Sequence, residues 1–321
     1  MSIGENIRKR RIDLGMSQQQ LAESLGYRTR SSIAKIESNQ SGLSPEKIIS
    51  ISHVLRTTTD YILHGISTPD SRSPGSVISH NELAVDKQAE NRKCVAVILA
   101  GGKTRINQYS IPYQFVSVRE KPIVIYTMEA FQRHPQIDEI HVVCLDGWED
   151  FLRRYAEKYN LTKLREIIPA GNSGVESVKN AVEWLRIEHT PYDLILIQEA
   201  TRPFVEPETI ANAILCCKKY GSAIVFERLD SLTPFLINES GSGLTHLNAN
   251  HLVNVQSPEV YTLGTLRQAF AEAEKINHPL TETICAVFLY HLGRNIRFCE
   301  GNHNNLRIVS EDDIKILNAL L

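Results

Sequence analysis

The chain has 321 residues, of which 42% are hydrophobic and 22% charged, a composition expected of a soluble globular protein with a sizeable core. This length is enough for two domains. The formal net charge of −2 excludes a protein that is basic throughout, so any nucleic-acid site has to be local. No run approaches the roughly 18 apolar residues of a membrane span, and the first residues lack the apolar segment of a signal peptide.

The six cysteines form no C-x-x-C pair. Cys216 and Cys217 are adjacent, an arrangement that suits neither a metal site nor a disulfide. Reduced thiols are usual inside the cell. We therefore expect a cytoplasmic protein that does not enter the membrane.

Residues 1–66 predict a small bundle of helices. Apolar residues recur there at the spacing of one helix face, and Gly15 and Gly26 stand where two helices are expected to end. Ser17 is a candidate helix cap, and Pro45 suits the first position of a later helix. The expected helices cover residues 3–14, 18–25, 30–38, 45–55 and 60–63. Two short helices joined by a glycine turn are typical of the helix-turn-helix arrangement.

Three short sequences in this segment resemble the phage-repressor-like (Cro/cI, XRE) helix-turn-helix family. They are MSQQQLAESLGY, RSSIAKIES and TTTDYILHG. The resemblance implies that the third helix enters the major groove of double-stranded DNA. The DNA-binding residues that it implies are Gln18, on the DNA backbone, and Arg28, Arg30, Ser31, Ser32 and Lys35, near the bases. The turn before the third helix is one residue longer than the commonest pattern. Whether Arg28 or Arg30 reads a base therefore stays open.

The charge of the segment agrees with DNA binding. Its nine Lys and Arg residues exceed its six Asp and Glu residues, which leaves a local balance of +3. Such an excess fits contacts with phosphates. The alternative is a solvated basic face on a bundle that binds another protein.

Residues 67–93 are rich in Ser, Pro, Asp, Asn and Gln and contain few apolar residues. This composition predicts a polar linker, with a short helical turn near residues 82–90. A flexible linker would tether two domains without fixing their mutual geometry. The domains would then be residues 1–66 and 94–321.

From residue 95 the pattern alternates between strands and helices. Val95 to Leu99 is an apolar run followed by Gly101 and Gly102, which predicts a buried strand and a tight turn suited to a phosphate chain. The expected strands are 95–99, 140–145, 166–168, 194–197 and 223–226, and the expected helices are 124–133, 148–159, 175–187, 206–219, 266–276, 282–292 and 311–320. This order predicts a Rossmann-like α/β domain with a mostly parallel, doubly wound sheet. Ligands bind such sheets beyond the carboxyl ends of the strands.

The words LAGGKTR, IPYQF, EKPIVIYTMEAF, QEATRPF and VQSPEVY follow one another in this part of the chain. They resemble the cytidylyltransferases that act on ribitol phosphate and methylerythritol phosphate, over residues 94–321. The resemblance implies a nucleotidyltransferase that joins CTP to a sugar-alcohol phosphate and releases pyrophosphate, with Mg²⁺ accompanying the bound triphosphate. It further implies that residues 230–255 form an arm used for dimerisation, and hence a homodimer.

The resemblance also assigns site residues. It gives catalytic roles to Lys103, Arg105 and Arg307. Nucleotide or phosphate binding falls to Ala100, Gly101, Gly102, Ser177, Glu199, Arg202 and Asp230. The candidate metal ligands are Glu199 and Asp230.

Several positions depart from the family pattern. The glycine loop is one residue shorter, Tyr113 stands where the family has a lysine, and Gly174 stands where it has an arginine. Two cations are thereby lost, and each preorganised electrostatic contact is worth about 2.7–4 kcal/mol of transition-state stabilisation. We expect chemistry slowed by ~10⁴ or more unless Lys103 compensates, while phosphate binding survives. His141 and His246 have no spacing typical of a metal site, and we assign them to packing or the surface.

Three functions follow from these observations. The first is a transcription regulator whose second domain senses a nucleotide or a sugar-alcohol phosphate. The second is an active cytidylyltransferase that also binds DNA. The third is a non-catalytic scaffold whose second domain provides dimerisation.

Overall fold

The computed structural model describes residues 3–27, 29–40, 43, 45–55, 57, 61–62, 92–105, 111–229, 232–238 and 240–321. Contacts along the chain separate it into two units, residues 1–83 and residues 84–321, and each unit is considered by itself. The predicted linker at 67–93 lies outside the described residues apart from Arg92 and Lys93. No described helix is long and apolar enough to span a bilayer.

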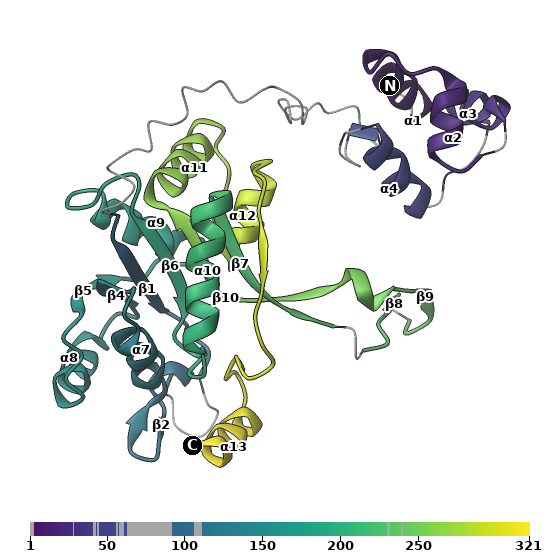
Figure 1. Ribbon diagram of the computed structural model, residues 1–321. Coiled ribbons are helices and arrows are strands. Elements are labelled where there is room, and N and C mark those ends of the chain that lie inside the picture. Colours follow the sequence, from purple (N-terminus) through teal and green to yellow (C-terminus); the bar gives the residue numbers. More distant parts are fainter. Residues whose placement is uncertain are drawn as a thin grey trace. The chain divides into compact units, whose positions relative to one another are not determined.

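The first unit is the predicted helical bundle (Figure 1). Its helices are α1 (Ile3–Asp13), α2 (Gln18–Ser24), α3 (Arg30–Glu37) and α4 (Pro45–Val54). They enclose a small apolar core that includes the fully buried Ile7, Leu21 and Ile33. Of the helix expected at 60–63, only Tyr61 and Ile62 are described, and both are buried.

Local signals explain where α2 begins. The Ser17 side chain accepts a hydrogen bond from the Gln20 amide, and the Gln20 side chain accepts one from the Ser17 amide, so the two form a capping box. Gly26 ends the segment with a positive φ of 76°. Helix α2 therefore begins after Ser17 and ends before Gly26, the two residues from which the sequence predicts its bounds.

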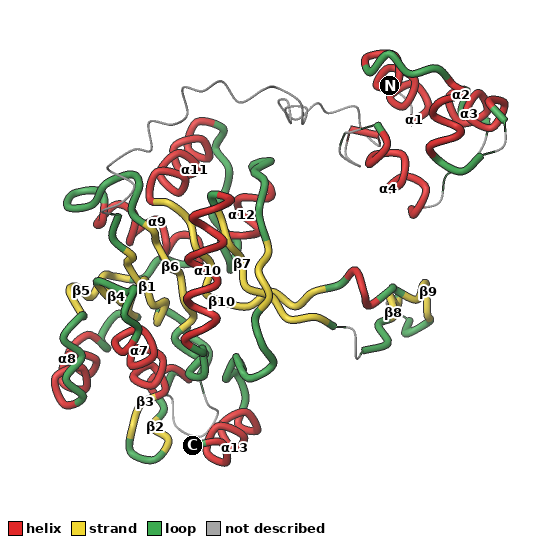
Figure 2. The backbone as a smooth tube through the Cα atoms, viewed as in Figure 1, coloured by secondary structure: helices red, strands yellow, loops and turns green. Residues whose placement is uncertain are grey.

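The second unit is built on a sheet of seven strands in the order β11-β7-β10-β6-β1-β4-β5 (Figures 1 and 2). These strands are β1 (Cys94–Ala100), β4 (Glu139–Cys144), β5 (Leu164–Pro169), β6 (Leu194–Glu199), β7 (Ser222–Arg228), β10 (Val253–Thr262) and β11 (Phe298–Glu300). Strand β10 runs antiparallel to both of its neighbours, and the other pairings are parallel. The sheet is thus mostly parallel, as predicted.

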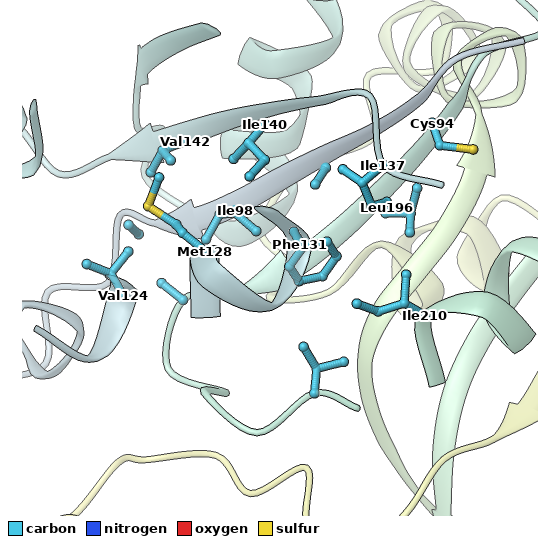
Figure 3. Close-up of a cluster of buried hydrophobic side chains, with 14 of the residues drawn as sticks. Cys94, Ile98, Val124, Met128, Phe131, Ile137, Ile140, Val142, Leu196 and Ile210 are labelled. Carbon is cyan, nitrogen blue, oxygen red and sulfur yellow. The ribbon is translucent and has the colours of Figure 1, made fainter. Parts of the chain in front are cut away.

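Helices cover both faces of this sheet. One face carries α7 (Ile123–Arg133), α8 (Glu149–Lys158) and α10 (Pro207–Tyr220), and the other carries α9 (Gly174–Leu185), α11 (Leu263–Lys275) and α12 (Cys285–His291). Each face of the sheet has its own apolar core, and alternate residues of β1 pack into one or the other. Ile98 faces α7, whereas Val97 faces α9. Figure 3 shows Ile98 beside Met128 and Phe131 of α7. Burial on both faces explains why the strands are continuous apolar runs.

The remaining elements are short or peripheral. They are η1 (Tyr113–Phe115), β2 (Ser117–Val118), β3 (Lys121–Pro122), β8 (Phe235–Ile237), β9 (Gly243–His246), η2 (Ala249–His251) and α13 (Glu311–Leu320). Strands β7 and β10 extend beyond the sheet toward the β8–β9 hairpin, which projects as an arm (Figure 2). The arm occupies the segment expected to dimerise.

Strand β10 is not among the strands predicted from the sequence. A register shift between Val255 and Glu259 interrupts its pairing with β7, and Pro258 stands inside it. Proline and a bulge both break the regular alternation by which a strand is found. The strand lies in the middle of the sheet because the two flanking parts of β10 still pair with β6 and β7.

Glu259 of β10 is a buried acid whose charge costs stability. Its Oε2 accepts hydrogen bonds from the Tyr261 hydroxyl, at 2.7 Å, and from the Ala286 amide at the start of α12, at 2.6 Å. Burial raises the pKa of Glu259 from 4.5 to about 7, and these two hydrogen bonds only partly oppose it. The folded protein therefore holds this proton more tightly than the unfolded chain does.

We expect this contribution to stability to be complete below about pH 4.5 and to be lost as the pH rises through about 7. One pKa unit corresponds to about 1.4 kcal/mol, so the loss is roughly 3 kcal/mol. The Glu259→Gln variant should keep the acceptor and remove this loss. Urea unfolding of the second unit between pH 5 and pH 8 measures the difference from wild type, with the exposed Glu274→Gln as control. Parallel pH profiles for wild type and Glu259→Gln would contradict the assignment.

Candidate active site

A cavity of about 330 Å³ opens beyond the carboxyl ends of β1 and β6, where ligands are expected in such sheets. Its walls come from the loop after β1, the start of α9, the end of β6, and the segment before α13. The lining residues are Leu99, Gly101, Gly102, Lys103, Thr104, Tyr113, Gln114, Gly171, Asn172, Ser173, Gly174, Ser177, Glu199, Thr201, Thr283, Arg307, Ile308 and Val309. Most of the predicted catalytic and phosphate-binding residues are therefore brought together.

The glycine loop is held by one buried side chain. Gln114 is 3% exposed, and its Nε2 donates to the Ala100 carbonyl at 2.9 Å and to the Gly102 carbonyl at 2.8 Å. Gly101 is needed for close approach, because a Cβ there would lie 2.5 Å from the Cβ of Ala170. The loop is therefore a fixed wall of the cavity.

The N-terminus of α9 forms the opposite wall. Ser173 caps this helix by accepting from the Glu176 amide at 2.9 Å. Ser177 is buried; its Oγ accepts from the Gly171 amide at 3.0 Å and donates to the Ser173 carbonyl at 2.8 Å. The amide end of a helix carries partial positive charge, so this wall favours an anion.

Gly174 stands where the family has an arginine, and the structure shows why no side chain fits. A Cβ at Gly174 would collide with the carbonyl oxygen of Thr283. The chain before α12 is bound closely to α9: the Val175 amide donates to the Glu282 carbonyl at 3.2 Å, and Ser173 Oγ donates to the Leu280 carbonyl at 2.6 Å. Backbone of Thr283 therefore occupies the space into which a side chain at residue 174 would extend.

Tyr113 stands where the family has a lysine. Its side chain is 9% exposed and packs in an apolar cluster with Ile308 and Leu317 while also lining the cavity. A packed aromatic ring supplies no charge to the cavity.

The charged residues of the lining are Lys103, Glu199 and Arg307, which leave one net positive charge. Arg307 Nε lies 2.9 Å from Glu199 Oε1, and Arg202 Nε lies 2.6 Å from Glu199 Oε2. Arg202 is 6% exposed, is not among the lining residues, and also donates to the Asn305 carbonyl at 2.7 Å. Arg202 therefore holds Glu199 from behind. Within the described part of the chain, no carboxylate pairs with Lys103.

A divalent cation was expected at Glu199 and Asp230. Each oxygen of Glu199 already faces a guanidinium group, and Asp230 lies outside the described residues. Mg²⁺ usually takes one or two carboxylates together with substrate phosphates. In this arrangement Glu199 does not fit a metal, because Arg307 and Arg202 each pair with one of its oxygens.

Other predicted site residues lie away from the cavity or are not described. Arg105 is exposed, forms a β-bridge with Pro112, and does not line the cavity. Arg28 lies outside the described residues. Three residues that shape the cavity were not predicted: Gln114, Ser173 and Thr283. Gln114 belongs to the quoted word IPYQF, but nothing in the sequence shows that Thr283 faces α9.

Four of the six proposed DNA-contacting residues lie on α3. Arg30, Ser31 and Lys35 are exposed, Ser32 is half-buried, and Ile33 between them is buried in the bundle core. Gln18 is half-buried and donates to the carboxylate of Glu37 at 2.8 Å. The helix thus presents a polar, basic face on the side opposite its core contacts.

A doubly wound α/β domain with a glycine loop, a helix N-terminus and cations around one cavity is typical of proteins that bind nucleotides or other phosphorylated ligands. Residues 94–321 match the model of 2-C-methyl-D-erythritol 4-phosphate cytidylyltransferase, and the chain belongs to this family. Residues 7–62 match the model described as helix-turn-helix. The two resemblances stated from the sequence are thereby confirmed.

Among similar proteins, ribitol-5-phosphate cytidylyltransferase of Lacticaseibacillus paracasei is 32% identical over 228 residues, covering 70% of this chain and 97% of the relative. A 2-C-methyl-D-erythritol 4-phosphate cytidylyltransferase of Clostridium botulinum is 29% identical over 225 residues, covering 70% and 96%. Among solved structures, 4-diphosphocytidyl-2C-methyl-D-erythritol synthase of Anaerococcus prevotii has a TM-score of 0.60 at 20% identity, covering 72% of this chain and 97% of that one. The structural likeness shows the fold.

Proposed function

We propose that this protein is a DNA-binding transcription regulator. Its second unit binds CTP, a related nucleotide or a sugar-alcohol phosphate, with catalysis weakened or lost. The observation that carries the proposal is the cavity at the family's active site, which keeps Lys103 and Arg307 but has backbone at Gly174 and an aromatic ring at Tyr113. Phosphate binding needs cations and amides, whereas phosphoryl chemistry also needs charge placed where it develops in the transition state.

The remaining charges support binding more than turnover. The cavity lining has one net positive charge. Glu199 partly neutralises the charge of Arg307 through a 2.9 Å ion pair. The amides at the start of α9 add partial positive charge without supplying a mobile cation. Such a site holds an anion, but it lacks two of the cations that its family places around the reacting phosphates.

The DNA-binding half of the proposal is supported by α3. Arg30 and Lys35 are exposed on one helix whose apolar side is buried, as expected of a recognition helix lying in the major groove. Gln18, Arg28, Ser31 and Ser32 complete the set that we propose to contact DNA.

We further propose that the protein is a homodimer, because the arm exposes apolar side chains. Phe235, Ile237 and Leu244 on β8 and β9 are each more than half exposed. Exposed apolar patches of this kind mark protein–protein contacts. A dimer would also pair two helix-turn-helix units for two half-sites. If the ligand is a nucleoside triphosphate, Mg²⁺ would accompany it mainly through the phosphates.

A second function is favoured by one observation. Lys103 and Arg307 both line the cavity, and Arg307 replaces the family's late lysine with a group of equal charge. If these two cations stabilise the transition state in place of the two missing ones, the protein is an active cytidylyltransferase that also binds DNA.

The test is ligand binding by the full-length protein, measured calorimetrically with CTP, CDP-ribitol, ribitol 5-phosphate and 2-C-methyl-D-erythritol 4-phosphate. At least one should bind, and Lys103→Ala should weaken it about 10- to 100-fold through the loss of a charge-assisted contact. Lys275→Ala, at an exposed position of α11, is the matched control and should change nothing.

The same sample is then offered genomic DNA fragments with and without the ligand. A change in the affinity of the retained fragments on adding the ligand supports a regulator. DNA affinity that is unchanged by every ligand, with no heat of binding, would instead identify a dimerisation scaffold.

A further inference from the structure

A cluster of side chains that can bind a metal ion lies at the opposite end of the strands from the cavity. Glu139 begins β4, His141 follows two residues later, and His189 lies in the connection between α9 and β6. These positions are near the amino ends of the strands, whereas the cavity lies beyond their carboxyl ends. One ligand atom from each of the three residues lies within 4.8 Å of the other two.

Two of the three separations between these atoms fit a tetrahedral zinc site. Glu139 Oε2 is 3.4 Å from His189 Nε2 and 3.6 Å from His141 Nε2. Zinc bonds to nitrogen and oxygen of 2.0–2.2 Å at tetrahedral angles separate neighbouring ligand atoms by about 3.4 Å. The two separations from Glu139 are therefore already those expected around a zinc ion, and the ligand atoms of His141 and His189 lie within 4.8 Å of each other.

His141 is the observation that points to a ligand. It is 4% exposed, and neither of its ring nitrogens has a hydrogen-bond partner in the described structure. An unpaired buried ring nitrogen costs free energy unless something binds it.

The other two ligands are oriented by surrounding groups. His189 Nδ1 lies 3.2 Å from Asp193 Oδ2, which leaves Nε2 directed at Glu139. Asp193 is itself held by the Thr190 hydroxyl and by the amides of Thr190 and Lys93. Lys93 Nζ binds Glu139 Oε1 at 2.6 Å and so leaves Oε2 to the histidines. A carboxylate behind a histidine is the usual outer support of a metal ligand.

We propose that Glu139, His141 and His189 form a zinc site, with Asp193 as the residue that positions His189. Two imidazoles and one carboxylate suit Zn²⁺ better than Mg²⁺ or Ca²⁺, which prefer six or more oxygen ligands. Two of the three ligands come from β4 and the third from the connection before β6. A bound ion would therefore link β4 to the start of β6 near Lys93, which precedes β1.

The test uses full-length protein carrying His278→Gln and His291→Gln, because those residues form another His–Glu cluster with Glu282. The protein is stripped with EDTA and dialysed against Zn²⁺, and bound metal is counted per chain. We expect one equivalent. Adding His141→Gln or His189→Gln should weaken binding at least about 100-fold, and Asp193→Asn about 10- to 100-fold.

Two readouts keep the test independent of folding defects. The thermal midpoint of the parent should rise with Zn²⁺ concentration, since binding to the folded state stabilises it. Zinc X-ray absorption on the same parent should show two histidine nitrogens and no sulfur. Retention of less than one-tenth of an equivalent, sulfur ligation, or binding that survives both His141→Gln and His189→Gln would overturn the proposal.

Discussion

Given CTP, ribitol 5-phosphate and Mg²⁺, the full-length protein is expected to release pyrophosphate about 10⁴-fold more slowly than the ribitol-5-phosphate cytidylyltransferase of Lacticaseibacillus paracasei under the same conditions. The reason is the two cations that the family resemblance leads us to expect and that this chain does not have at these positions. Tyr113 packs into an apolar cluster, and Gly174 faces the carbonyl of Thr283. Each missing electrostatic contact costs about 10²-fold or more in rate.

Restoring one cation provides the internal check. Tyr113→Lys places an ammonium at the edge of the cavity, because a lysine stem can replace part of the ring packing while its charge reaches the opening. We expect a rise of about 10²-fold in turnover. Gly174→Arg should give no rise, since its Cβ would displace the Thr283 backbone. A wild-type rate within tenfold of the relative would show that Lys103 and Arg307 suffice, and the protein would be an enzyme.

The second large effect is expected in the first unit, where Glu37→Ala should lower the free energy of unfolding by about 3–5 kcal/mol. Glu37 is 7% exposed, and its carboxylate accepts from Arg11 at 2.6 Å and from Gln18 at 2.8 Å. Arg11 is itself 9% exposed, so the substitution leaves a buried charge without its counter-ion. Hydrogen exchange of the backbone amides of α1, α2 and α3 in the full-length protein measures this loss.

Glu23→Ala is the matched control, because Glu23 is exposed and, among the hydrogen bonds described, its side chain accepts only from the Gln19 side chain. Its effect should stay within about 0.5 kcal/mol. DNA binding should fall with the stability of the unit in Glu37→Ala and remain in Glu23→Ala. Unchanged exchange in Glu37→Ala would mean that Arg11 is solvated well enough to need no partner.

Much of the fold could be predicted because its signals are local. The apolar run at β1, the capping serine at α2 and the glycine after it each act within a few residues of chain, and the structure places these elements within one or two residues of expectation. Several of the predicted site residues line one cavity because neighbours in the sequence stay together after folding, such as Gly101 and Gly102 after β1. Strand β10 escaped because Pro258 and a register shift disrupt its pattern.

The sequence by itself determined the two resemblances and most of the order of strands and helices around β1, and it predicted that cations are missing at Tyr113 and Gly174. Only the tertiary structure decided what occupies the space of a lost side chain, as Thr283 does beside Gly174. It likewise decided which distant residues meet: Arg202 supports Glu199 instead of lining the cavity, and His141 meets His189. The physical reason is that caps, turns and periodicity are properties of a short stretch of chain. Close approach and charge pairing depend instead on how separate stretches pack.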